Sequence, residues 1–596
     1  MSRNLPKRQN QTSLYTSWRI QVWYAALIFV LIVFIARLFY LQVIRHDHYR
    51  AEALASQLKE YSIPAERGLI KAYENGTPVP LVLNQKLYTL YADPTFIKQP
   101  SEVALKLAAI THGDAVKYAN LMKAQNTRYA ILEKKLSDLQ KDQITALKLP
   151  GIGTQPQEYR IYPQASLASQ LLGFVDNDGK GRYGVEQELN SALSGKVGTL
   201  KAITDVNGVP LAASKDNIQI DPKNGSDVLL TIDLGMQKQL ESYLDQDVKN
   251  SKSPSGSALI MDVNTGAVKA MANYPTYDPS QFFNVTDGSV FNNNAVSDAF
   301  EVGSVMKVLT ASAALDQGVI TPTTSYFDPG QWPLDGHIVK NVEEDGGAGP
   351  SNVAKILDLS MNTGATWMLM QMGHTTGEVN QTARDEWYDY MTNHFQFGKP
   401  TGIEQSYDAA GYVPQPDKGY ALQLTYANTS FGQAVTVTPL QMAAALSSVL
   451  NGGTYYRPHL VDQVTGSNQN NNQSTVVKRG VVSEKVSQEM QALMEGVTQT
   501  KLDQGFSFMK FPDGYSVGGK TGTAQIPSPD GGYYGDRFNG AFIGFVGGDK
   551  PQYVIMVDVK EPKIPGYAGS TAAMPLFADL AHMLINNFNV TPKSGS

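Results

Sequence analysis

The sequence predicts an α+β fold divided into a membrane-spanning N-terminus, a smaller mixed α/β region and one large C-terminal domain. Three observations support this prediction. One long apolar stretch lies near the N-terminus, short strand-like and helix-like segments follow it, and strand patterns stand at both ends of the C-terminal region with helical sequence between them. The expected boundaries are 1–19 for a cytoplasmic tail, 20–44 for the anchor, 45–225 for the smaller region and 226–590 for the large domain.

The apolar stretch Ile20–Ile44 has the length and composition of a transmembrane helix. Its 25 residues carry one charge, Arg37, and at about 1.5 Å per residue they exceed the roughly 30 Å hydrocarbon core of a bilayer. Four basic residues precede the stretch and three follow it, which favours a cytoplasmic N-terminus and places the rest of the chain outside the cytoplasm. A cleaved signal peptide is the alternative, but the small-residue sequence Ala53–Ala55 lies well beyond the apolar run.

Composition narrows the chemistry that this chain can perform. The 596 residues include no cysteine, which excludes disulfides, thiolate metal sites and a cysteine nucleophile. There are eight histidines and no H-E-x-x-H zinc motif. The formal net charge of −6 excludes a globally basic nucleic-acid binder. An enzyme of this composition would work through hydroxyls, amines, carboxylates or amides.

Hydrophobic periodicity predicts individual elements along the rest of the chain. Period-two or continuous apolar runs predict strands at 87–91, 228–232, 258–263, 268–271, 541–546 and 553–559. Helical patterns are expected at 103–110, at the charge-rich 129–147 and at 576–584, where leucines recur every four residues. Turn residues between the neighbouring strands indicate two hairpins, one at each end of the large domain.

Ser304 and Lys307 are the most informative candidates for catalysis. The run Val305–Leu315 is apolar on nearly every side, which is typical of a buried core helix. Ser304 is therefore expected at a helix start, where unpaired N–H groups favour developing negative charge, with Lys307 on the same face. Because burial lowers the pKa of a lysine, Lys307 could be the base that activates Ser304. An N-capping serine beside a solvated lysine is the alternative, since S-x-x-K is common by chance.

A second candidate motif is Ser360-Met361-Asn362, which follows the apolar run Ile356–Leu359. A serine and an amide that project from one tight loop can relay a proton and hold an amide substrate. In isolation, the same residues are also compatible with an ordinary turn stabilised by serine or asparagine.

The third motif is Lys520-Thr521-Gly522-Thr523. With Gly514 and Gly519 it also satisfies G-x-x-x-x-G-K-T, the pattern of a phosphate-binding loop. That loop must lead directly into a helix, whereas a glycine and two prolines follow here. The sequence therefore favours an extended strand at 520–525 over a nucleotide site.

S-x-x-K, S-x-N and K-T-G-T occur in the order that is typical of penicillin-binding proteins and β-lactamases. The chain resembles a class B penicillin-binding protein over nearly its whole length. Further segments that carry the resemblance are Arg37-Leu38, Glu66–Ile70, Arg160–Pro163, Gly184–Gln187, Asn294–Val296 and Ala541–Phe545. The resemblance implies that 45–225 is an elongated, non-catalytic pedestal (dimerisation) domain. It also implies that 226–590 is a transpeptidase domain, an antiparallel sheet with helices on both faces.

The resemblance also implies a role for each site residue. Ser304 would attack the penultimate D-alanine carbonyl of a peptidoglycan stem peptide, and Lys307 would accept its proton. Ser360 would pass a proton to the leaving amine, Asn362 would hold the substrate amide and Lys520 would supply positive charge. The segment Thr521-Gly522-Thr523 would bind substrate, with both threonines on its carboxylate. The N–H groups of Ser304 and Thr523 would form the oxyanion hole. No metal or cofactor is implied.

Rival functions remain open. A class A β-lactamase would need a deacylating glutamate in an E-x-x-L-N sequence between Asn362 and Lys520, and none occurs there. A non-catalytic β-lactam sensor or scaffold of the same fold is the second rival. The segment Leu90–Pro94 and the moderate pedestal favour the septal over the elongation type.

The expected partners are lipid-linked or nascent peptidoglycan stem peptides, β-lactams, a multi-spanning membrane glycosyltransferase, and division or elongation proteins. No nucleic acid is expected among them. The expected location is the cell membrane, with a single span.

Overall fold

The computed structural model describes residues 14–49, 58–124, 127–203, 218–342, 347–466, 474–529 and 531–595. The chain forms two compact units. One contains Met1–Ala65 and Lys196–Asn224, and the other contains Glu66–Gly195 and Gly225–Ser596. Every candidate site residue lies in the second unit.

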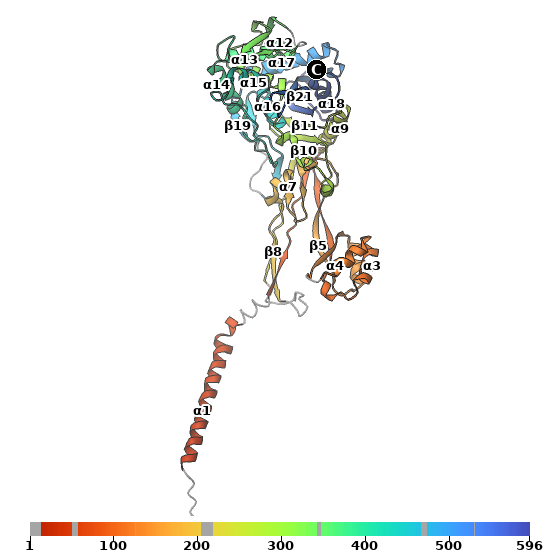
Figure 1. Cartoon of the computed structure of the whole chain (residues 1–596), viewed down its shortest axis with the longest axis vertical. Helices are drawn as coiled ribbons and strands as arrows, with labels where there is room; N and C mark the ends of the chain where they lie inside the picture. Colours follow the sequence, from red (N-terminus) through yellow and green to blue (C-terminus); the bar gives the residue numbers. More distant parts are fainter. Residues whose placement is uncertain are drawn as a thin grey trace, which may run out of the picture. The chain divides into compact units, whose positions relative to one another are not determined.

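The first unit contains the predicted membrane-spanning segment. Helix α1 (Leu14–Phe39) continues through a π-helical turn (Tyr40–Ile44), and its stretch Trp18–Ile44 is long and apolar enough to cross a membrane (Figure 1). The helix predicted at 20–44 is therefore confirmed. The unit also holds an antiparallel sheet in the order β1-β8-β9, with bounds Leu58–Ile63, Gly198–Ile203 and Ile218–Ile220.

A six-stranded sheet in the second unit combines strands from distant parts of the sequence. Its order is β18-β10-β2-β3-β4, and β5 also pairs with β3. β10 runs parallel to β2 and antiparallel to β18, so the strand predicted at 228–232 is confirmed and joins the sheet of the preceding region. The bounds are β2 Ile70–Glu74, β3 Thr77–Ala92, β4 Ala130–Leu136, β5 Ile152–Ile161, β10 Val228–Asp233 and β18 Val461–Val464.

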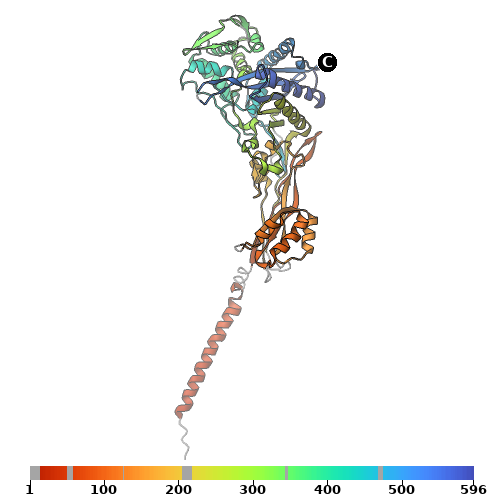
Figure 2. The ribbon, with the colours of Figure 1, turned by 45° about the vertical axis from the view of Figure 1, so that its right-hand side comes forward.

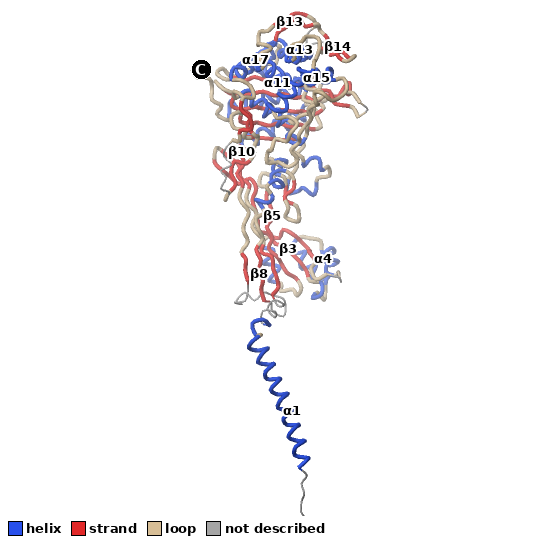
Figure 3. Tube along the Cα trace, turned by 90° about the vertical axis from the view of Figure 1, so that its left-hand side faces the viewer, coloured by secondary structure: helices blue, strands red, loops and turns tan. Residues whose placement is uncertain are grey.

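Three helices pack at the β4 end of this sheet, at α3 (Pro100–Thr111), α4 (Ala115–Met122) and α5 (Asp138–Ala146) (Figure 3). The strand predicted at 87–91 is confirmed within β3, and the helix predicted at 103–110 is confirmed as α3. The single helix predicted at 129–147 is wrong in its first half, which is β4. Buried Ala130 and Leu132 alternate with exposed Ile131, and Ser137 then starts α5 with a capping box. Because the segment contains many charged residues, its short alternation of buried and exposed positions was mistaken for part of a helix.

The C-terminal region is built on a five-stranded sheet in the order β12-β11-β22-β21-β20, antiparallel throughout. Both predicted hairpins are confirmed, because β11 pairs with β12 and β21 pairs with β22. The bounds are β11 Ser255–Asp262, β12 Val268–Tyr274, β20 Ser516–Pro527, β21 Tyr533–Gly547 and β22 Pro551–Lys560.

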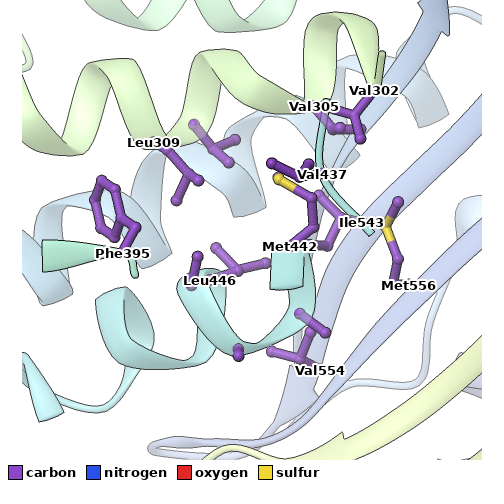
Figure 4. Packing of buried hydrophobic residues seen from close by; sticks show 14 of the residues in the cluster. Val302, Val305, Leu309, Phe395, Val437, Met442, Leu446, Ile543, Val554 and Met556 are labelled. Atoms are coloured by element: carbon purple, nitrogen blue, oxygen red, sulfur yellow. The ribbon is translucent and has the colours of Figure 1, made fainter. Parts of the chain in front are cut away.

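Helices cover both faces of this sheet, as expected. Alternate strand residues such as Ile260 and Phe542 pack on α9 (Leu234–Asn250) and α18 (Met574–Asn587), the latter confirming the predicted closing helix (Figure 2). The residues between them, such as Ile543, pack on α11 (Lys307–Asp316) and α16 (Pro439–Leu450) (Figure 4). Because successive strand residues point to opposite faces, a sheet of nearly all-apolar strands needs cover on both sides.

The remaining elements lie between β12 and β20 or support the first sheet. Helices α12, α13, α14, α15 and α17 span Val353–Asp358, Asn362–Met372, Gln381–Asp389, Leu422–Ser430 and Glu484–Asp503. Three small hairpins pair β13 (Ser325–Asp328) with β16 (Gly349–Asn352), β14 (Gln331–Leu334) with β15 (His337–Lys340), and β17 (Thr454–Tyr456) with β19 (Val476–Arg479). Shorter elements are β6 Phe174–Val175, β7 Gly181–Arg182, α6 Ser169–Leu172, α7 Gly184–Glu188, α8 Asn190–Leu193 and α10 Asn294–Ser297.

Asp247 on α9 predicts a pH dependence of stability. One of its carboxylate oxygens is buried without a hydrogen-bond partner in the ranges that the structure describes, and burial together with the charge of Asp579 raises its pKa to about 7. Between about pH 4 and pH 7 the folded protein keeps a proton that the unfolded chain has lost, so the free energy of unfolding falls as pH rises through this window. Asp247→Asn is expected to increase that free energy by roughly 2 kcal/mol at pH 8 and by little at pH 4.5.

Thermal unfolding of the full chain in detergent at both pH values would measure this effect. Asp245→Asn is the matched control, because Asp245 lies on the same helix in an exposed ion pair with Lys249. That substitution should change stability by less than about 1 kcal/mol. A gain from Asp247→Asn that is equal at both pH values would contradict the assignment.

Candidate active site

Ser304 lies in a short 3-10 turn (Gly303–Met306) that leads into α11, a helix whose residues are almost all buried. The predicted core helix is thus confirmed, with Ser304 in the turn before it. Gly303 has φ +63°, and a Cβ atom there would lie 2.7 Å from the carbonyl oxygen of Thr523. Only glycine lets this turn pack directly on strand β20, so the backbone itself brings Ser304 beside the K-T-G-T segment.

The side chain of Lys307 is fully buried, at 0% exposure, and its Nζ links the first two motifs. It lies 2.9 Å from Ser304 Oγ, 3.2 Å from Ser360 Oγ and 2.8 Å from Asn362 Oδ1, and it also donates to the carbonyl oxygen of Ser360. Four oxygen atoms from three residues thus lie within hydrogen-bond distance of one amine nitrogen. Lys307 is therefore held in one position among the oxygens that surround it.

Ser360 occupies a turn between α12 and α13 with φ +58°, in the left-handed region that few non-glycine residues adopt. This conformation ends α12 and aims both the carbonyl and the hydroxyl of Ser360 at Lys307. Asn362 then begins α13, and its amide donates to the carbonyl of Lys340 at 3.3 Å. Backbone strain of this kind is often found at functional sites, where the surrounding structure maintains it.

Lys520 joins the third motif to the second. Its side chain is 1% exposed, and its Nζ lies 2.9 Å from Ser360 Oγ and 3.1 Å from the carbonyl oxygen of Thr521. Ser360 Oγ is consequently within hydrogen-bond distance of two lysine amines. The structure thus brings together Ser304, Lys307, Ser360, Asn362 and Lys520, which the sequence separates by more than two hundred residues.

The K-T-G-T segment is extended, as predicted, in β20. It pairs antiparallel with β21, for example Lys520 with Ile543, so no helix follows it as a phosphate-binding loop would require. Thr521 and Thr523 line a cleft, and Thr523 Oγ1 accepts a hydrogen bond from the N–H of Gly569 at 3.0 Å. Gly522 lies behind them, where a Cβ would be 2.6 Å from the Val302 carbonyl.

The cleft has a volume of about 960 Å³ and contains Ser304, Ser360 and Asn362 in its lining. Sequence reasoning missed most of the remaining residues that line the cleft. They come from four places: Phe431 and Gln433 after α15; Asp358, Lys501, Gln504 and Phe506 near α12 and α17; Gln525 and Phe538 on β20 and β21; and Tyr567, Ser570 and Thr571 before α18. These residues form no recognisable sequence motif. Partial burial raises the pKa of Asp358, although Thr500 and the nearby lysines Lys520 and Lys501 act in the opposite direction.

Two sequence families cover most of the chain. Residues 256–582 match the family described as the penicillin-binding protein transpeptidase domain, and residues 62–230 match the penicillin-binding protein dimerisation domain. The chain therefore belongs to the penicillin-binding proteins that carry a transpeptidase domain.

Its relatives narrow this assignment. Stage V sporulation protein D of Bacillus subtilis is 31% identical over 580 residues, covering 95% of this chain and 86% of that protein. Peptidoglycan D,D-transpeptidase FtsI of Escherichia coli K12 is 26% identical over 593 residues, covering 98% and 95%. The crystal structure of penicillin-binding protein 3 from Mycobacterium tuberculosis with aztreonam shares 26% identity at a TM-score of 0.66, covering 89% of this chain and 98% of that one. The protein is thus a class B member, which confirms the resemblance seen in the sequence.

Proposed function

We propose that this protein is a peptidoglycan D,D-transpeptidase that cross-links stem peptides through an acyl-enzyme on Ser304. The observation that carries the proposal is the continuous hydrogen-bonded set from Ser304 through Lys307 and Ser360 to Lys520 in the cleft. A nucleophile needs a base within hydrogen-bond reach, and the base needs groups that orient it. Both conditions are met here without a thiol, and the related FtsI carries this activity in its name.

The first half-reaction forms the acyl-enzyme. Neutral Lys307 accepts the hydroxyl proton as Ser304 Oγ attacks the carbonyl carbon of the penultimate D-alanine. The N–H groups of Ser304 and Thr523 stabilise the resulting oxyanion. The C–N bond to the terminal D-alanine then breaks, and the leaving nitrogen receives the proton of Lys307 through Ser360, which leaves Lys307 neutral again. Ser360 suits this relay because its hydroxyl lies between the two lysine amines.

The second half-reaction transfers the acyl group. An amine on a neighbouring stem peptide attacks the ester carbonyl and loses a proton to Lys307. The new amide forms as the Ser304–acyl bond breaks, and Lys307 returns the proton to Ser304 Oγ. Lys520, Thr521 and Thr523 hold the carboxylate of the donor before it leaves, and Asn362 holds a substrate amide. Gly522 contributes by letting β20 pack closely against the turn that carries Ser304.

We place this activity at the division septum, in a membrane-anchored protein whose N-terminus is cytoplasmic. The names of the relatives FtsI and Stage V sporulation protein D and the basic residues before the anchor support this placement. A multi-spanning glycosyltransferase and division proteins would be its partners. The alternative is an elongation-type enzyme, and a tagged protein found along the sidewall instead of at septa would favour it.

Labelling with a fluorescent penicillin tests the proposed nucleophile. The wild-type protein should form a long-lived adduct that peptide mapping places on Ser304, and Ser304→Ala should lose all labelling. Ser297→Ala is a control, because Ser297 bonds to the backbone of Asn293 and does not line the cleft. Equal labelling of Ser304→Ala would overturn the assignment. Rapid release of the adduct would indicate a β-lactamase, and a labelled protein inert towards stem peptides even with its partners would indicate a sensor.

A further inference from the structure

Glu301 lies three residues before Ser304 and has no role in the chemistry described above. One of its carboxylate oxygens, Oε1, accepts hydrogen bonds from the N–H of Ala434 at 2.8 Å and from the hydroxyl of Tyr533 at 3.0 Å. The other oxygen is buried without a hydrogen-bond partner among the described residues. Burial raises the pKa of this carboxyl, and the two donors oppose the rise. Burying a carboxylate oxygen without a hydrogen-bond partner destabilises the folded protein, which suggests that Glu301 has a role in function.

The donors to Glu301 belong to two different walls of the cleft. Ala434 follows Phe431 and Gln433, which line one wall. Tyr533 is the first residue of β21, opposite Pro527 at the tip of the β20–β21 hairpin. The same hairpin supplies Thr521, Thr523, Gln525 and Phe538 to the cleft lining. Glu301 therefore connects the nucleophile segment to both walls from outside the cleft.

Backbone contacts reinforce one of these connections. Gly303 donates to the carbonyl of Gly432 at 3.0 Å, and Phe300 and Val437 exchange two hydrogen bonds of 3.1 Å. A Cβ at Gly432 would lie 2.1 Å from the Gly303 carbonyl oxygen, so these backbones touch. The hairpin tip has no such backbone ladder to the nucleophile segment in the part of the chain that the structure describes. The Tyr533 hydroxyl, which bonds to Glu301 and to the backbone of Ala434, connects the tip to that segment.

We propose that Glu301 is a positioning residue that holds the β20–β21 hairpin tip and the 431–434 loop in register with Ser304. Its carboxylate does not touch substrate. It acts on the reaction through the cleft walls and through β20, the strand that carries Thr523. Loss of the Tyr533 bond would let the tip of the β20–β21 hairpin shift relative to the nucleophile segment, so that the transition state loses alignment while the cleft stays open to ligand. This inference rests on the proposed acylation of Ser304.

Stopped-flow acylation of the full chain in detergent by a chromogenic β-lactam tests the proposal, because it yields a maximal rate constant and a half-saturating concentration separately. Tyr533→Phe is expected to lower the maximal rate constant about tenfold, with the half-saturating concentration changed by less than about twofold. Glu301→Ala should be at least as slow. Glu301→Gln should stay near the wild-type rate, because its amide oxygen can still accept from both donors.

Two comparisons decide between positioning and general destabilisation. Tyr534→Phe is the matched control on the same strand, since that hydroxyl bonds to Arg537 and not to Glu301. The double variant Glu301→Ala/Tyr533→Phe should be no slower than Glu301→Ala alone. Wild-type acylation rates in Tyr533→Phe, additive losses in the double variant, or equal slowing by Tyr534→Phe would each overturn the inference. A wild-type protein that is not acylated at all would instead overturn the proposed function.

Discussion

Replacing Lys307 by methionine is expected to slow acylation of Ser304 by about a thousandfold or more. Positioned general bases contribute roughly 10²–10⁴-fold, and Lys307 is the amine nearest to the serine hydroxyl, at 2.9 Å. Methionine has a similar length and can occupy the buried site, but it cannot accept a proton. The rate constant for adduct formation with a chromogenic β-lactam would measure the loss, which should fall on the maximal rate and not on ligand affinity.

Two controls accompany the Lys307 variant. Lys355→Met removes an exposed lysine of α12 that donates to the Pro350 carbonyl on β16, and this variant should acylate at the wild-type rate. Thermal unfolding should show that Lys307→Met remains folded, although Asn362 loses a hydrogen-bond donor. A folded Lys307→Met protein that acylates within tenfold of wild type would assign the base to another group, of which Lys520 acting through Ser360 is the nearest.

Replacing Glu186 by alanine is expected to destabilise residues 66–195 by about 3–5 kcal/mol. The Glu186 side chain is 0% exposed and pairs with two arginines. Arg160 Nε donates to Oε1 at 2.9 Å, and Arg67 donates to Oε2 with Nε at 2.8 Å. Breaking a buried ion pair by removing one partner leaves the other charge desolvated and uncompensated, and here two guanidinium groups would be left.

Denaturant unfolding of the full chain in detergent would measure the Glu186 effect. Asp176→Ala is the matched control, because Asp176 pairs with a half-exposed Arg182 at 2.7 Å in the same part of the chain. That substitution should cost about 1 kcal/mol or less. A similar small loss for Glu186→Ala would show that water or rearranged side chains replace the missing carboxylate.

The sequence was sufficient to predict which hydroxyls, amines and amide the structure brings together in the cleft, but not the walls of that cleft. Ser304 and Lys307 are recognisable because a core helix brings a hydroxyl and an amine three residues apart onto one face. Lys520 could be assigned to a strand because Gly522 and the prolines after it exclude a helix. Phe431 and Gln433 carry no comparable signal, since aromatic and amide residues after a helix are common and only the tertiary fold places them in a cleft. The tie from Glu301 to Tyr533 spans more than two hundred residues and has no local pattern.

The predicted strands are correct where the hydrophobic pattern is strong. The prediction is wrong at β4, where charged residues interrupt that pattern. The hairpins at both ends of the large domain consist of long apolar runs, and the structure has them as predicted. In β4 only Ala130, Leu132 and Leu136 are buried. Three apolar positions among charged residues give a weak alternation, which sequence reasoning did not recognise as a strand. The domain boundary at 225/226 remains a prediction.

The pairing of β10 with β2 has a practical consequence for work on the isolated catalytic part. A fragment that starts at residue 226 would keep β10 but lose β2, the strand that pairs with one edge of β10. Val228, Leu230 and Ile232 are fully buried in the intact protein, and the fragment would present an unpaired edge beside them. Such an edge is a template for intermolecular pairing, so we expect a fragment that starts at residue 66 to be more soluble than one that starts at residue 226.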